Sequence, residues 1–142
     1  MRNILLAYDG SDNAKRALQY IIDFAQDAPK PLQVQVFNAQ PEPVIYGEYV
    51  TSAMVEELNA SLLKKSRELL DEAGMQLAAA GIAHQTHTAI GHVAEEVNEA
   101  VERLGCDTVV MGTRGLGSFA GMLGSVANRV IHEVSVPVLL VK

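Results

Sequence analysis

Two features of this chain are suited to binding a ligand: an acidic hydrogen-bond acceptor after the first apolar run, and a glycine-rich segment near the end that could hold an anion. Asp9 follows the apolar run 3–8. A second apolar run, 107–111, leads into five glycines within thirteen residues, and Ser125 follows them at the start of an amphipathic stretch. The five are Gly112, Gly115, Gly117, Gly121 and Gly124. A strand, a glycine loop and a helix N-terminus bring unpaired N–H groups and the positive end of a helix dipole to one place, which favours phosphate binding.

Each of these side chains also has a plainer interpretation. Asp9 either accepts hydrogen bonds from an amine or hydroxyl of a ligand, or only opens the turn into the first helix. Ser125 either offers its hydroxyl to the ligand or serves as the N-cap of the last helix. Arg114 meets phosphate charge or stays in solvent. The loop lacks the lysine of a P-loop and the spacing of the dinucleotide fingerprint, so neither motif is present.

No catalytic or metal-binding arrangement is legible. His84 and His87 stand three apart in a predicted strand, which places them on opposite faces and makes them poor co-ligands. His132 is expected in solvent, and His92 opens a helix where a ligand could lie nearby. No nucleophile is paired with a base. The predicted site therefore has no catalytic residues and no metal ligands.

Composition narrows the choice of partner. The net charge is −6 and the pI about 5.1, which disfavours nucleic acid and anionic lipid as partners. No apolar run reaches the roughly 18 residues of a membrane span, and the N-terminal run is too short for a signal peptide. The one cysteine, Cys106, is expected to be a small buried thiol, with a reactive thiol as the alternative. These features predict a cytoplasmic protein.

Apolar runs and amphipathic stretches alternate along the whole chain. Strands are predicted at 3–8, 32–39, 82–90, 107–111 and 136–141. Helices are predicted with apolar faces over 14–25, 93–104 and 126–134, and over about 54–80. The polar run 82–90 suits a sheet edge. The alternation predicts one α/β domain over residues 1–142, with a parallel sheet and helices on both faces.

Two segments stand apart from this pattern. Residues 40–53 carry prolines, glycine and tyrosines and are predicted to be a long loop that closes over a ligand. The last strand is almost wholly apolar, and a final strand often lies at an edge. Pairing of Val136 to Val141 with the same strand of a second copy would cover it, giving a homodimer. A covering loop or helix is the alternative.

Four pieces of the chain, in order, resemble the universal stress protein family in its single-domain bacterial form. They are Ile4-Leu-Leu-Ala-Tyr-Asp-Gly-Ser11, Val109-Val-Met-Gly-Thr-Arg-Gly115, Gly124-Ser-Val126 and Val136-Pro-Val-Leu-Leu-Val-Lys142. The resemblance implies an open five-stranded parallel sheet of order 3-2-1-4-5, a Rossmann-like fold of the adenine nucleotide alpha hydrolase type. Strands one and four would then be neighbours, with Asp9 and the glycine loop at one crevice. It also implies dimers paired through the last strand.

The ATP-binding members of that family share the pattern G-x-x-G-x₉-G-[ST]. Carried over to this chain, the nucleotide-binding residues would be Ala7, Asp9, Ala39, Met111, Gly112, Gly115, Gly124, Ser125 and Val126. The resemblance implies ATP as the ligand, commonly with Mg²⁺ or Mn²⁺. This chain departs from the pattern, because eight residues, Leu116 to Leu123, lie where the pattern has nine.

The function predicted from this pattern is a small stress-response regulator that binds ATP between strands one and four. It would signal through its dimer or through an unknown protein partner, with at most slow ATP hydrolysis. The alternative is a dimeric interaction protein of the same fold that binds no nucleotide because its phosphate loop is one residue short. An enzyme built on the same crevice is a third possibility.

Overall fold

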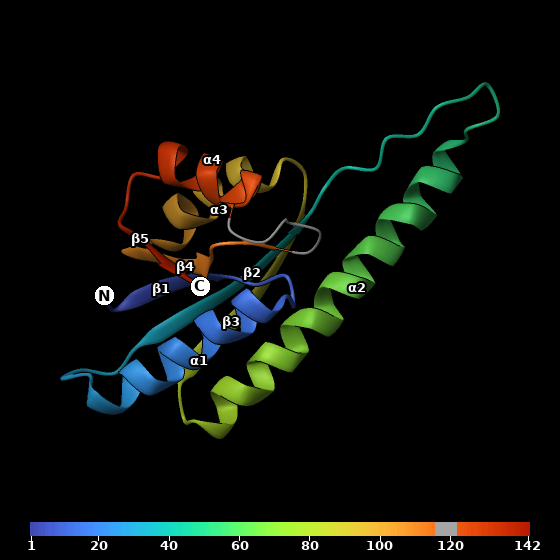
Figure 1. Cartoon of the computed structure of the whole chain (residues 1–142). Coiled ribbons are helices and arrows are strands. Elements are labelled where there is room, and N and C mark those ends of the chain that lie inside the picture. The colour runs from blue at the N-terminus through green and yellow to red at the C-terminus, as the bar shows by residue number, and fades with distance from the viewer. Residues whose placement is uncertain (116–121) are drawn as a thin grey trace.

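Five parallel strands form one sheet in the order β3-β2-β1-β4-β5 (Figure 1). The computed structural model describes residues 1–115 and 122–142. Gly117 and Gly121 of the predicted phosphate loop lie outside these described residues. The strands are β1 (Asn3–Ala7), β2 (Gln33–Gln40), β3 (Ala83–Ile90), β4 (Thr108–Gly112) and β5 (Val138–Val141). The helices are α1 (Asp12–Asp27), α2 (Ser52–Ala79), α3 (Val93–Leu104) and α4 (Ser125–Glu133). The predicted fold class and strand order are confirmed.

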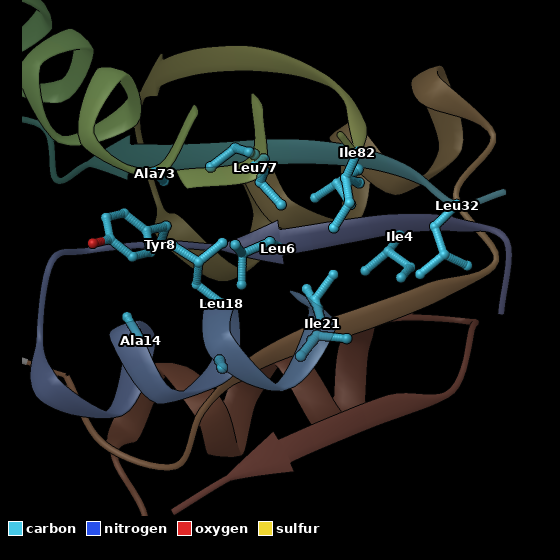
Figure 2. Packing of buried hydrophobic residues seen from close by; sticks show 14 of the residues in the cluster. Ile4, Leu6, Tyr8, Ala14, Leu18, Ile21, Leu32, Ala73, Leu77 and Ile82 are labelled. Atoms are coloured by element: carbon cyan, nitrogen blue, oxygen red, sulfur yellow. The ribbon is translucent and has the colours of Figure 1, made fainter. Parts of the chain in front are cut away.

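Alternation along the inner strands supplies a core on each face of the sheet. Ile4 and Leu6 of β1 pack against α1 and α2, where they meet Leu18 of α1 and Leu77 of α2 (Figure 2). Leu5 points to the other face and packs with Val97 of α3 and other residues of α3 and α4. All of these side chains are fully buried. Because β1 and β4 bury both faces, they carry the continuous apolar runs that predicted them.

The two edge strands differ in chemistry, as expected. β3 is polar, and its two histidines lie on opposite faces of the sheet. His84 comes close to Gly74 of α2, and His87 contacts the side chain of Gln35 on the neighbouring strand β2. β5 pairs with β4 along one edge, from Val138 opposite Val109 to Val141 opposite Gly112. Among the described residues, no strand pairs with the outer edge of β5.

Local signals set the ends of the helices. The Ser11 hydroxyl caps α1 by accepting a hydrogen bond from the amide of Ala14 at 3.2 Å. Gly81 follows α2 with a φ of +70°, the left-handed conformation that glycine takes readily after a helix. α2 begins at Ser52, two residues earlier than predicted, because Thr51 caps it through the amide of Met54.

The segment between β2 and α2 does not cover the sheet. It runs away from the sheet together with the first half of α2, so the two form a projecting arm (Figure 1). Tyr46 and Tyr49 are each 89% exposed in this arm. The predicted closure of residues 40–53 over a ligand is therefore not seen in this structure.

Candidate functional site

A cavity of about 400 Å³ opens at the carboxyl ends of β1, β2 and β4. The strand order reverses here, because β1 pairs with β2 on one side and with β4 on the other. Crevices at such a point are the usual ligand sites of open α/β sheets. Its size lies within the ~300–1,000 Å³ of small-molecule sites. The structure brings all nine predicted site residues to the walls of this cavity: Ala7, Asp9, Ala39, Met111, Gly112, Gly115, Gly124, Ser125 and Val126. Their role in binding remains a prediction.

Asp9 uses its two carboxylate oxygens differently. Oδ1 accepts a hydrogen bond from the amide of Ser11 at 2.9 Å, which fixes the turn into α1. Oδ2 faces Gly115, where an added Cβ would stand only 2.5 Å from it. Among the described residues, none donates a hydrogen bond to Oδ2. Asp9 therefore opens the turn, as the plainer interpretation held, and still presents one acceptor at the wall of the cavity.

Two of the glycines have packing reasons of their own. A Cβ on Gly112 would lie 2.6 Å from Cβ of Asn13 and 3.1 Å from the amide nitrogen of Ala14, so β4 ends tightly against the first turn of α1. Gly115 leaves room for the Asp9 carboxylate. Neither glycine has a positive φ. Close approach of neighbouring groups therefore accounts for both positions.

The first turn of α4 faces the cavity. Gly124 is the N-cap of this helix, and its amide donates to the carbonyl of Thr113 at 2.8 Å. Ser125 is the first helical residue, so its alternative role as the N-cap is wrong. The amides of Ser125, Val126 and Ala127 belong to the first turn and have no intrahelical acceptor. Within the described part of the chain they form no other hydrogen bond, which leaves three N–H groups for an anion.

The rest of the wall was missed by sequence reasoning. Apolar side chains from α1, β2, α3 and α4 complete it, and the buried Asn38 anchors it by donating from Nδ2 to the carbonyl of Tyr8 at 2.7 Å. The additional lining residues are Tyr8, Ser11, Ala14, Phe37, Asn38, Pro41, Val93, Val97 and Ala127. Burial, and then the nearby Glu72 carboxylate, raise the pKa of Tyr8 to about 12, so its phenol stays neutral. The sequence could indicate this wall only once the strand order was known, because that order places the end of β2 beside the end of β1.

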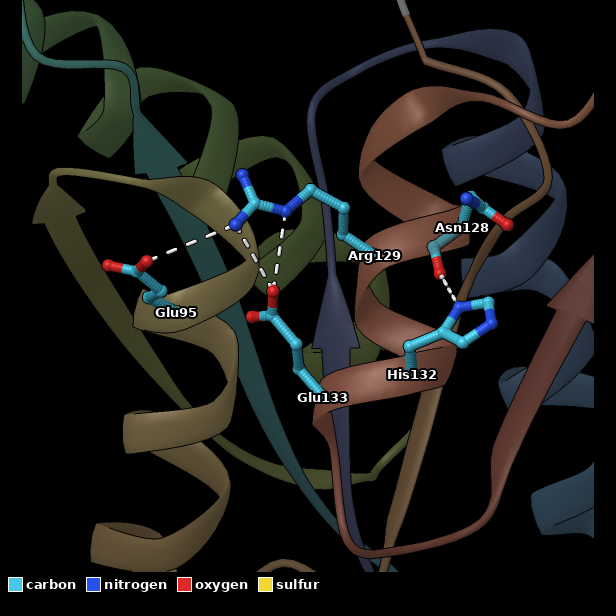
Figure 3. A network of polar contacts seen from close by, with 5 residues as sticks. All are labelled: Glu95, Asn128, Arg129, His132 and Glu133. Carbon is cyan, nitrogen blue, oxygen red and sulfur yellow. Dashed lines mark hydrogen bonds and ion pairs between the residues drawn. The ribbon is translucent and has the colours of Figure 1, made fainter.

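Exposed ion pairs lie on the outer surface of α3 and α4, behind one wall of the cavity. Arg129 of α4 lies 3.9 Å from the Glu95 carboxylate of α3 and 3.2 Å from Glu133 of its own helix (Figure 3). His132 of the same helix contacts the carbonyl of Asn128 at 2.7 Å and lies outside the cavity wall. The Arg129 contacts are exposed and therefore weak. Buried apolar packing between α3 and α4 positions Val97 and Ala127 at the cavity.

Charge at the cavity is sparse. Asp9 and Arg114 are the charged residues that the structure places on its walls. Arg16, on the helix that Asp9 opens, instead donates to the carbonyl of Lys142 and to Asn13. His92 is exposed and away from the wall. Over residues 1–115 and 122–142, no three histidine, cysteine or carboxylate side chains gather closely enough to hold a metal ion.

Fold and site together define an α/β protein with a ligand crevice at the switch point of its sheet, walled by an acceptor, a helix N-terminus and apolar side chains. Comparison with known proteins identifies the family. The model of the universal stress protein family matches residues 1–142. A universal stress protein of Thermus aquaticus is 36% identical over 99% of this chain and 98% of its own length. The chain belongs to the universal stress protein family.

Solved structures show the same architecture. The protein MJ0577 superposes with a TM-score of 0.85 at 26% identity, over 99% of this chain and 95% of that one. Three further structures superpose with TM-scores of 0.73, 0.66 and 0.66 at 18, 22 and 22% identity, over at least 99% of this chain and 92% of theirs. They are an Arabidopsis thaliana protein with AMP bound, a universal stress protein in complex with cAMP, and one from Archaeoglobus fulgidus in complex with dAMP. Among the described residues of this chain, no helix combines the length and apolar character that crossing a membrane requires.

Proposed function

We propose that this protein binds an adenine nucleotide, ATP, in the cavity between β1 and β4 and acts as a stress-response regulator rather than as an enzyme. One observation carries the proposal. The free oxygen of Asp9 and the first turn of α4 line the same open cavity, and apolar side chains line the remainder. Family membership and the three nucleotide complexes of similar fold support the choice of an adenine compound.

The chemistry of the walls suggests how the ligand lies. Apolar side chains such as Ala39 and Val97 suit the flat adenine ring. Asp9 Oδ2 suits a ribose hydroxyl, because a carboxylate accepts strongly from hydroxyl donors. The phosphates would lie at the amides of Ser125 and Val126, with Arg114 beside them. Mg²⁺ or Mn²⁺ would be held mainly by the phosphates of ATP, because the described residues offer no cluster of three histidine, cysteine or carboxylate side chains.

Binding would be relayed to the last strand through Thr113. The Thr113 carbonyl accepts the amide of Gly124, and the Thr113 amide donates to the carbonyl of Val141 at 2.8 Å. The phosphate end of the cavity and the edge of β5 therefore share one residue. If the chain dimerises through Val136 to Val141, a nucleotide that binds the first turn of α4 would also shift the position of β5 at the dimer interface. A protein partner would recognise the shifted form of the dimer.

Isothermal titration calorimetry with ATP and Mg²⁺, and separately with AMP, tests the proposal. Gly124→Val should abolish binding because its side chain occupies the phosphate end, whereas Ser135→Val, at an exposed position past the other end of α4, should bind like wild type. Asp9→Asn should keep the turn to Ser11 and weaken binding. The absence of heat at millimolar concentrations of both nucleotides would instead favour the interaction protein that binds no nucleotide.

A further inference from the structure

The first half of α2 projects from the body of the molecule (Figure 1). Every buried residue of this 28-residue helix lies in its second half: Ser66, Leu70, Ala73, Gly74 and Leu77. None of residues 52–65 is buried. These fourteen residues span about 21 Å at 1.5 Å per residue. A helix of this length in water gains most of its stability from packing. The inner side of this half-helix is only half-buried, at Val55, Asn59, Leu62 and Leu63, so it packs less within the single chain than the second half does.

The side of the projecting half that faces away from the body can be identified from burial. Ser66 is completely buried and marks the side toward the sheet. At 100° per residue, Glu57, Ser61 and Lys64 lie on the opposite side of the helix. All three are exposed. Two small residues, Ala60 and Ser61, stand at the middle of this outer side, where another helix could approach closely.

The charges on this half-helix are antisymmetric about the point between Ala60 and Ser61. The sequence from 56 to 65 reads Glu-Glu-Leu-Asn-Ala-Ser-Leu-Leu-Lys-Lys. If a second copy of the helix runs antiparallel about a two-fold axis at that point, Glu57 of each copy faces Lys64 of the other, whereas Glu56 and Lys65 lie on opposite flanks of the helix and do not meet. Each such contact occurs twice, as an isologous interface requires.

Axes centred on the acids or on the lysines are worse. An axis between Glu56 and Glu57 brings acid against acid, and one between Lys64 and Lys65 brings base against base, both of which are unfavourable. The acids also have no basic partner in their own helix, because Asn59, Ala60 and Ser61 stand three and four residues further along. The three ion pairs between described residues involve neither acid.

We infer that the first half of α2 is an interaction surface for the same half-helix of a second copy, packed antiparallel about a two-fold axis at Ala60 and Ser61. This contact lies far from β5 (Figure 1). A molecule that also pairs through β5 could therefore use both surfaces and form higher assemblies.

Charge reversal tests the inference. Sedimentation velocity over a range of concentrations should show an association step that weakens as salt rises, because the contact depends on exposed ion pairs. Glu57→Lys and Lys64→Glu should each weaken that step about tenfold, since each change turns two attractive contacts into two repulsive ones. The double variant Glu57→Lys/Lys64→Glu should restore it. Single variants that associate like wild type, or a double variant that stays as weak as the singles, would overturn the inference.

Disulfide cross-linking gives an independent test of where the two-fold axis lies along α2. Ser61→Cys should form a disulfide-linked dimer under mild oxidation, because the two copies of residue 61 would lie beside the axis. Glu68→Cys on the same side of α2 should not, since its two copies would stand about 22 Å apart along the helix pair. The native Cys106 is buried and adds little background. Equal cross-linking of both variants would place the contact elsewhere.

Discussion

Replacing Gly112 with alanine tests how tightly the floor of the cavity is packed. The new Cβ would stand 2.6 Å from Cβ of Asn13 and 2.9 Å from its carbonyl carbon, whereas carbon atoms in contact need about 3.5 Å or more. The first turn of α1 must therefore retreat by roughly 0.6–0.9 Å. Overpacking of this kind costs about 1–3 kcal/mol, and the lower chain entropy of alanine offsets about 0.4–1 kcal/mol. We expect the free energy of unfolding to fall by about 1–2 kcal/mol.

Urea unfolding followed by circular dichroism measures this loss, and the melting temperature should drop by roughly 4–8 °C. Gly115→Ala is the matched control. Its Cβ would meet only the tip of the Asp9 carboxylate, which can rotate aside, so stability should change by less than about 0.5 kcal/mol. Nucleotide affinity should nevertheless fall in Gly115→Ala, because the displaced oxygen is the one on the cavity wall. A Gly112→Ala protein as stable as wild type would refute the tight contact between β4 and α1.

Three further predictions concern the titratable groups and the outer wall. Burial, and then the charge of Arg103, lower the pKa of His87 below 6.5, so the unfolded chain binds its proton more readily. The free energy of unfolding should therefore decrease as pH falls below 6.5, down to the lowered pKa, and His87→Gln should remove that part of the slope in urea titrations at each pH. Burial, and then the Asp107 carboxylate, raise the pKa of Cys106 to about 11, so a thiol reagent should label it only when the chain opens; rapid labelling of the native protein would contradict this. Arg129→Gln should change the melting temperature by no more than about 2 °C, because its ion pairs are exposed.

The sequence predicted the strands and helices to within a few residues because their signals are local. The continuous apolar runs of β1 and β4 and the spacing along α1 and α3 indicate both element type and buried face. The order of the strands is not local, and it came from the family resemblance. Once β1 and β4 are neighbours, the crevice beside Asp9 follows from the geometry of parallel sheets.

The remaining features depend on contacts between distant parts of the chain. Asn38 reaches the cavity because its side-chain amide donates a hydrogen bond to the carbonyl of Tyr8, just after the adjacent strand β1. No pattern within β2 predicts that hydrogen bond. Gly112 looks like part of a phosphate loop in the sequence, yet the first turn of α1 explains it. The prediction that residues 40–53 close over the ligand used composition alone. Composition does not specify direction, and the segment leaves the sheet alongside α2.

Asp9 shows why two competing interpretations of a residue can both describe it. A carboxylate has two oxygens, and the backbone turn uses only one of them. The hydrogen bond from the Ser11 amide favours the side-chain orientation that directs the second oxygen toward the cavity, which lowers the entropy cost of presenting it. A longer acid at this position would lose the short bond to the Ser11 amide and would also meet the crowded space at Gly115. The structural role of Asp9 therefore preorganises the acceptor that the proposed nucleotide site requires.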